Sequence, residues 1–96
     1  MKDINIVGME PGVFGVQVTE AQGVETSHRV TVPDDFGIEI GVPELDLELL
    51  VRETFAFLLE REPATSILQE FSLDEIDRYF PDYREEIAAR VTAQAG

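Results

Sequence analysis

The spacing between apolar residues changes once along this chain, and that change limits the folds open to it. In the first third, Phe14–Thr19 and Ser27–Val32 alternate in character, which is the period of a strand with one buried face. From Leu47 to Val91 the apolar residues recur at the i, i+3 and i+4 spacing of helices. This order predicts an α+β domain in which an N-terminal β ribbon packs on helices.

The two alternating segments are expected to pair as an antiparallel ribbon, because Glu20–Gly23 ends in a glycine that can adopt the positive φ of a turn. Ile4–Val7 is expected to add a third short strand, separated from the ribbon by a loop over Gly8–Gly12. A two-stranded ribbon is marginally stable by itself, so its apolar face must be covered. The residues expected on that face are Phe14, Val16 and Val18 on one strand and His28, Val30 and Val32 on the other.

The segment after Asp46 is expected to provide this cover as a central helix. Asp46 is a good N-cap, and Pro63 is expected to end the helix near Glu62. The apolar residues occupy more than half of the helix circumference, which predicts packing on two sides. They are Leu47, Leu49, Leu50, Val51, Phe55, Ala56, Phe57, Leu58 and Leu59.

Two or three shorter helices are expected beyond Pro63. The first is expected to start at Thr65 or Ser66 and to continue through Phe71. Ser72–Glu75 matches a capping box, which predicts the start of the next helix.

Pro81 is expected to break that helix, and the last helix is expected near Asp82–Ala93. The 96 residues are expected to form one domain, since a chain of this length has no room for a second core. Its parts are a ribbon over 1–32, a connector over 33–45 and a helical part over 46–93.

The charge of the chain is strongly negative: 20 Asp and Glu against seven Lys and Arg give a net charge of −13. With 44% hydrophobic residues the chain is nevertheless expected to fold. Scattered cations disfavour direct binding to nucleic acid and to anionic membranes. The acidity fits a basic protein partner, a solvated surface or adaptation to salt, and the sequence leaves these alternatives open.

The residue types required for several kinds of catalysis are missing. There is no cysteine, and His28 is the only histidine, without a carboxylate at a catalytic spacing. The serines lack the nucleophile-elbow pattern, and the glycines match no nucleotide-binding loop. No catalytic residue and no cofactor are predicted. Without a secretory or membrane-spanning apolar run, a cytoplasmic location is expected.

Carboxylates crowd the segment from the connector into the central helix, where they form the weak candidate for a metal site. Their spacing lacks the alternating pattern of a calcium-binding loop, so helix capping and solvated charge are the favoured explanations. The three candidates for metal ligands are Asp34, Asp35 and Glu39, with Glu44, Asp46 and Glu48 following.

The stretch Arg78–Arg84 concentrates aromatic and basic residues around Pro81. Aromatic residues beside arginines have the composition of a protein-binding hot spot. Packing in the core is nevertheless the favoured explanation of these aromatic residues, because small domains bury their aromatic side chains, and the interaction patch is the functional alternative. The candidate interaction residues are Arg78, Tyr79, Phe80, Tyr83 and Arg84.

Two short motifs in the helical part, Glu60-Arg61-Glu62-Pro63 and Arg78-Tyr79-Phe80-Pro81, carry a resemblance. Through them the segment from Val51 to Tyr83 resembles a family of short uncharacterised bacterial proteins, which join an N-terminal β ribbon to such a helical part. The resemblance covers residues 14–90 and implies a shared fold. It implies no activity and no catalytic residues.

These observations favour a non-enzymatic protein–protein interaction module, such as an adaptor or an antitoxin. Its expected partner is a different protein, and a basic one. The first alternative is a small enzyme that depends on the carboxylates or on a metal. The second is a homodimer that buries the surface of the central helix or the edge of the ribbon.

Overall fold

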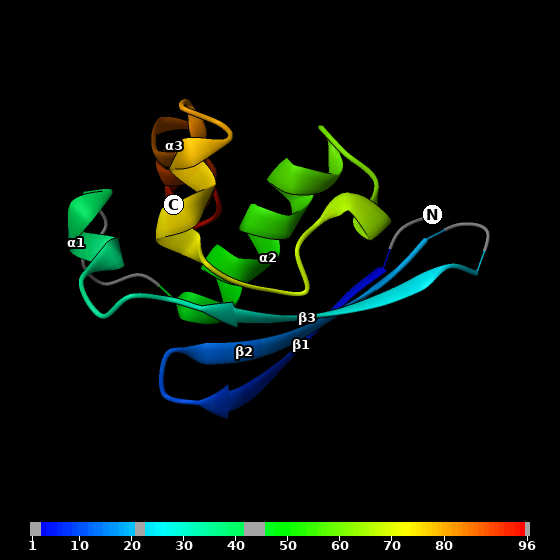
Figure 1. Cartoon of the computed structure of the whole chain (residues 1–96). Coiled ribbons are helices and arrows are strands. Elements are labelled where there is room, and N and C mark those ends of the chain that lie inside the picture. Colours follow the sequence, from blue (N-terminus) through cyan, green and yellow to red (C-terminus); the bar gives the residue numbers. More distant parts are fainter. Residues whose placement is uncertain (1–2, 21–22, 42–45, 96) are drawn as a thin grey trace.

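The computed structural model describes residues 3–20, 23–41 and 46–95 of the chain (Figure 1). A β-sheet forms one layer, and the helices lie together on one of its faces (Figure 1). The α+β class is therefore confirmed. In chain order the elements are β1 (Asp3–Glu10), β2 (Val13–Thr19), β3 (Glu25–Thr31), α1 (Phe36–Glu39), α2 (Leu47–Leu59), the 3-10 turn η1 (Ala64–Ser66), β4 (Glu70–Ser72), the 3-10 helix η2 (Leu73–Arg78) and α3 (Tyr83–Ala95).

Within the described residues, the sheet has four strands in the order β1-β2-β3-β4. The first three are antiparallel, as predicted, and Gly23 has the positive φ of 81° expected in the turn between β2 and β3. β1 extends to Glu10 with a bulge after Gly8, so the loop predicted over Gly8–Gly12 is shorter than expected. The longer strand forms because Gly8 and Glu10 still pair with β2.

The core lies between the sheet and α2, and between α2 and α3. Phe55 faces the sheet, where its ring centroid lies 5.3 Å from that of His28 and 6.0 Å from that of Phe71. Phe57 faces α3, with its ring 5.3 Å from that of Tyr83. Two positions along a helix turn the side chain by about 200°. The prediction that this helix packs on two sides is therefore confirmed.

Asp46 starts α2 as predicted, since its Oδ1 atom accepts the backbone N–H groups of Glu48 at 3.0 Å and Leu49 at 3.4 Å. These amides have no partner within the helix, so the carboxylate satisfies groups that would otherwise depend on water. The helix ends at Leu59, three residues before the expected end at Glu62.

The helix predicted from Thr65 or Ser66 through Phe71 is wrong. The chain makes a single 3-10 turn and then enters β4, which runs parallel to β3. The backbone N–H of Arg29 donates to the carbonyl of Gln69 at 2.7 Å, and Phe71 is buried against α2. Pairing with a distant strand therefore overrides the local helical spacing.

The capping box predicted at Ser72–Glu75 is also wrong, because the Ser72 hydroxyl makes no cap hydrogen bond. The six residues of η2 form a 3-10 helix instead of an α-helix. Its tighter turn, with i to i+3 hydrogen bonds, places the first amides differently from the geometry that a capping box requires.

Candidate functional site

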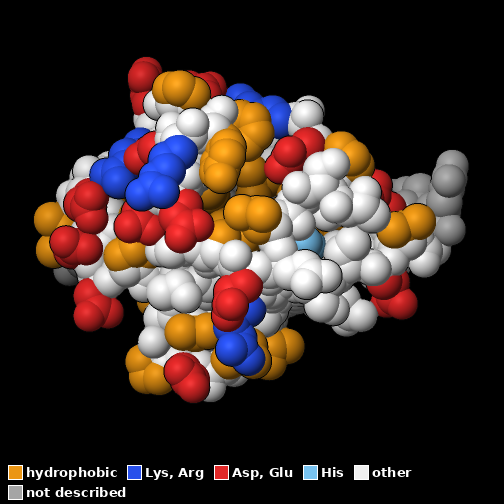
Figure 2. All heavy atoms as spheres, viewed as in Figure 1, with side chains coloured by type: hydrophobic (Ala, Val, Ile, Leu, Met, Phe, Trp, Pro, Cys, Tyr) orange, Lys and Arg blue, Asp and Glu red, His pale blue; other side chains and the backbone are white. Residues whose placement is uncertain are grey.

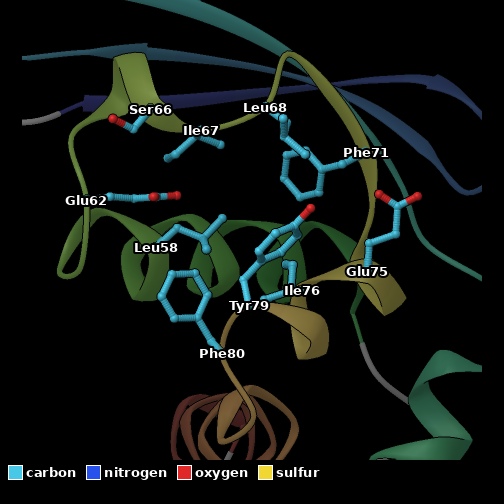
Figure 3. Close-up of a pocket in the computed structure, with 10 residues that line it drawn as sticks. All are labelled: Leu58, Glu62, Ser66, Ile67, Leu68, Phe71, Glu75, Ile76, Tyr79 and Phe80. Atoms are coloured by element: carbon cyan, nitrogen blue, oxygen red, sulfur yellow. The ribbon is translucent and has the colours of Figure 1, made fainter.

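A groove opens between the end of α2, the segment 66–68, β4 and η2 (Figure 3). We call it the acid-flanked groove. Its volume is about 330 Å³, which is near the lower limit for binding sites of small molecules. The residues that line it are Leu58, Glu62, Ser66, Ile67, Leu68, Phe71, Glu75, Ile76, Tyr79 and Phe80.

The acid-flanked groove is mainly apolar, with a buried floor and an exposed rim. Leu58, Ile67, Phe71 and Ile76 are buried and form the floor. Two large side chains are exposed at the rim, Leu68 at 52% and Tyr79 at 67%. The Tyr79 ring lies across the middle of the groove, with its hydroxyl directed toward Leu68 and Phe71 (Figure 3). The floor belongs to the core, whereas the rim is free to contact another molecule.

Two carboxylates stand at opposite sides of this apolar surface, Glu62 beside Leu58 and Glu75 beside Phe71 (Figure 3). No lysine, arginine or histidine side chain of the described residues lines the groove. Figure 2 shows hydrophobic side chains gathered in the upper middle of this face, with acidic side chains on both sides of them. The groove is therefore suited to a ligand with an apolar group for the groove itself and an adjacent positive charge for the carboxylates at its sides.

The segment 66–68 at the rim is held to the sheet by His28. Because a carbonyl oxygen only accepts, His28 Nδ1–H donates to the Leu68 carbonyl, at 2.7 Å. Nε2 of the same ring then accepts from the Thr26 hydroxyl at 2.8 Å. Both ring nitrogens are thus occupied, which gives this buried histidine a structural role in fixing the groove.

Replacing His28 by leucine is expected to lower the free energy of unfolding by about 1–3 kcal/mol, because the Leu68 carbonyl and the Thr26 hydroxyl lose their partner. It should also speed hydrogen exchange at the Arg29 amide, which donates to the adjacent Gln69 carbonyl.

Chemical denaturation and amide exchange measure the two effects of the His28 substitution. The matched control is Ser27→Ala on the exposed side of the same strand, for which a change within about 0.5 kcal/mol is expected. Equal effects of the two substitutions would contradict the anchoring role.

The predicted interaction residues take different positions in the structure. Tyr79 and Phe80 line the acid-flanked groove, and Arg78 is exposed outside its lining. Tyr83 is fully buried between α2 and α3, so it cannot form part of an exposed patch, and this assignment is corrected. Its burial follows from the i, i+4 spacing that places it on the inner face of α3.

Arg84 is also engaged inside the molecule. Its guanidinium donates to Glu39 at 2.9 Å and to Asp77, and it lies 5.6 Å from the centre of the Phe36 ring. The hydrogen bonds with Glu39 and Asp77 raise the pKa of Arg84. The residue therefore connects α1, η2 and α3 and is not a free cation for a partner.

The candidate metal ligands Asp34, Asp35 and Glu39 do not form a site. Across residues 3–20, 23–41 and 46–95, no group of three His, Cys, Asp or Glu side chains is arranged to hold a metal ion. Glu39 is paired with Arg84, while Asp34 and Asp35 are exposed at the start of α1. Glu44 lies outside the described residues.

Most of the groove was not predicted from the sequence. The spacing of Leu58 and Ile76 indicates helices but not their proximity, and Phe71 was assigned to a helix. Glu62 and Glu75 were interpreted only as a motif residue and a capping residue. The available signal was the cluster of aromatic residues next to Pro81, because Tyr79 and Phe80 of that cluster line the groove.

The chain matches no protein-family model, and neither the curated proteins nor the solved structures contain a significant match. The resemblance carried by the Glu-Arg-Glu-Pro and Arg-Tyr-Phe-Pro motifs stays a prediction. Among the helices in the described ranges, none has the length and apolar character needed to cross a membrane.

Proposed function

We propose that this protein is a non-enzymatic interaction module, and that its acid-flanked groove binds a segment of another protein. The segment inserts apolar side chains between Leu68 and Tyr79 and places Lys or Arg beside Glu62 and Glu75. An adaptor or an antitoxin that recognises a basic partner would work in this way. The proposal includes a cytoplasmic location and contact with neither nucleic acid nor membrane.

The observation that carries this proposal is an exposed apolar rim between two carboxylates that no basic side chain of the groove neutralises. When a partner covers the apolar surface of Leu68 and Tyr79 that is still exposed to water, each side chain contributes on the order of 1–2 kcal/mol to the free energy of binding. The floor is already packed, so a partner meets a largely formed surface and loses little free energy to ordering it.

Electrostatics favour a basic partner for a second reason. Four of the described arginines already form ion pairs with acids of the same chain, which leaves most of the acidic surface without a counter-charge. A net charge of −13 attracts cationic partners over roughly one Debye length and speeds their association. These four arginines are Arg29, Arg61, Arg84 and Arg90.

The two motifs that carry the family resemblance also meet at this groove. Glu62 comes from the first motif, and Tyr79 and Phe80 come from the second. We propose that relatives which share these motifs share the acid-flanked groove, whatever partner each of them binds.

Selection from a random peptide library on the immobilised protein tests the proposed function. We expect the selected peptides to combine bulky apolar residues with Lys or Arg, and we expect Leu68→Asp to abolish their binding. The double variant Glu62→Gln with Glu75→Gln should weaken binding by roughly 2- to 30-fold, at about 0.2–1 kcal/mol for each ion pair.

The matched control is Glu48→Gln with Glu85→Gln, which removes the same amount of charge from exposed positions outside the groove. We expect this control to change affinity by less than about two-fold, since only the general field is reduced. Selected peptides without basic residues, or equal losses in the two double variants, would refute the proposed function.

A further inference from the structure

Among the residues that the structure describes, the outer edge of β1 is open. The strand order places β1 at one end of the sheet, and no described segment pairs with its far side. An unpaired edge strand exposes backbone donors and acceptors that can pair with another chain. Which groups are exposed follows from the register of the sheet.

The direction of the backbone groups can be traced across the sheet from β3. Arg29 donates its N–H toward Gln69, on the β4 side of β3. In an extended strand these groups alternate sides from one residue to the next, so those of Val30 point to β2. Val30 pairs with Phe14, so the backbone N–H and C=O groups of Phe14 point back to β3.

The same alternation continues into β1. The backbone N–H and C=O groups of Gly15, the neighbour of Phe14, point to β1. Those of Val7, the residue that pairs with Gly15, point back to β2. The residues on either side of Val7, Ile6 and Gly8, therefore turn their N–H and C=O groups to the open edge. Ile4 faces the same way.

An independent contact agrees with this assignment. Nη1 of Arg52, on α2, donates to the Ile4 carbonyl oxygen at 3.2 Å. That carbonyl already accepts one donor, so Ile6 and Gly8 are the residues of this edge whose N–H and C=O groups both lack a partner among the contacts of the described residues.

The edge is uncharged where these groups are free, although the chain as a whole is strongly acidic. No charged residue occurs between Ile4 and Met9, and the acids Asp3 and Glu10 stand at the two ends of β1. Val7 is 64% exposed and Met9 50%, so the strand also presents apolar side chains. Two acidic molecules can approach at such a site with little repulsion at its centre.

We infer that the open edge of β1 binds β1 of a second copy of this chain in antiparallel orientation. Ile6 then pairs with Gly8 of the second copy. Val7 lies on the two-fold axis, opposite Val7 of the second copy. The alternative register, with Ile6 opposite itself, would place Gly8 against the Ile4 carbonyl that Arg52 occupies. The pairing joins two sheets into one and leaves both acid-flanked grooves outside the contact.

This dimer should respond to salt in the opposite direction from the proposed function. The pairing places Glu10 opposite Ile4 of the second copy, near both its Asp3 and its Arg52, so these local charges offset one another, and it joins two molecules of net charge −13. Screening at about 0.5 M salt should therefore tighten self-association several-fold, whereas it should weaken binding of a basic peptide to the groove.

Sedimentation equilibrium of the full chain tests this inference, with Val7→Lys as the main variant. Val7→Lys places two like charges opposite each other and should weaken the dimer several-fold. The amides of Ile6 and Gly8 should exchange more slowly at high protein concentration in the wild type but not in this variant. Circular dichroism checks that the variant folds.

The matched control is Gln17→Lys, which adds the same charge on β2, on the exposed face but away from the edge. Edge pairing predicts little change for it, whereas face-to-face stacking of two sheets would be disrupted. A monomer at all concentrations and salt levels, a dimer that tolerates Val7→Lys, or a dimer lost with Gln17→Lys would each overturn the inference. Glu62→Gln with Glu75→Gln should leave the dimer intact, so each proposal can fail without the other.

Discussion

Replacing Phe55 by alanine is expected to lower the free energy of unfolding by about 3–5 kcal/mol. The ring is fully buried and lies between His28 on β3 and Phe71 on β4, so its removal leaves a cavity where the sheet meets α2. A domain of this size has a total stability of about 5–15 kcal/mol. One substitution therefore removes a large part of it. Urea denaturation measures the loss.

Tyr79→Ala is the control for this cavity, since it truncates an aromatic side chain that is largely exposed. We expect it to cost less than about 1 kcal/mol, because little packing is lost. If both substitutions destabilised the protein equally, the assignment of Phe55 to the core and of Tyr79 to the groove rim would be contradicted.

The second large effect is expected at the buried hydrogen bond between Thr54 and Tyr83, whose oxygens lie 2.7 Å apart between α2 and α3. Tyr83→Phe should cost about 1–3 kcal/mol, because it leaves the Thr54 hydroxyl buried without its partner. Thr54→Val in the same background should restore part of the loss. A double variant whose loss equals the sum of the single losses would show that the two hydroxyls are not coupled.

The same tyrosine predicts how stability depends on alkaline pH. Burial, as the main cause, raises the pKa of Tyr83 above its ordinary value of 10.0, so the hydroxyl stays neutral in the folded state. Its contribution to stability is complete below about pH 10 and decreases as the pH rises further, by up to about 1.4 kcal/mol per pH unit. Tyr83→Phe should reduce this slope, whereas Tyr79→Phe at the exposed position should retain it. Identical slopes in the two variants would contradict the assignment.

The sequence predicted the local parts of the fold well, because their signals are local. The alternation in β2 and β3, the Asp46 cap and the apolar spacing of α2 and α3 each depend on residues within a few positions of one another. Even the two-sided packing of α2 could be predicted, since the apolar surface of that helix is too wide for one contact.

The parts that the sequence did not predict depend on contacts between distant residues. β4 has three residues, too few to show a strand period, and it forms by pairing with Arg29–Thr31 some forty positions earlier. The acid-flanked groove inherits this difficulty, because the segment that carries Leu68 is held by residues far away in the sequence, through the hydrogen bonds from His28 to Leu68 and from Arg29 to Gln69. Of the candidate interaction residues, Tyr79 and Phe80 therefore line the groove and Tyr83 lies in the core, while their role in binding stays a prediction.

The most direct measurement of the central claim is a titration of methyl-labelled protein, followed by NMR, with two short peptides. Both peptides carry the same leucines, flanked in one by lysines and in the other by glutamates. If the groove binds apolar segments that carry positive charge, the lysine-flanked peptide shifts the methyl signals of Ile67, Leu68 and Ile76, and the glutamate-flanked peptide leaves them unchanged. Equal shifts with both peptides, or shifts at Val7 and Met9 instead, would contradict this claim.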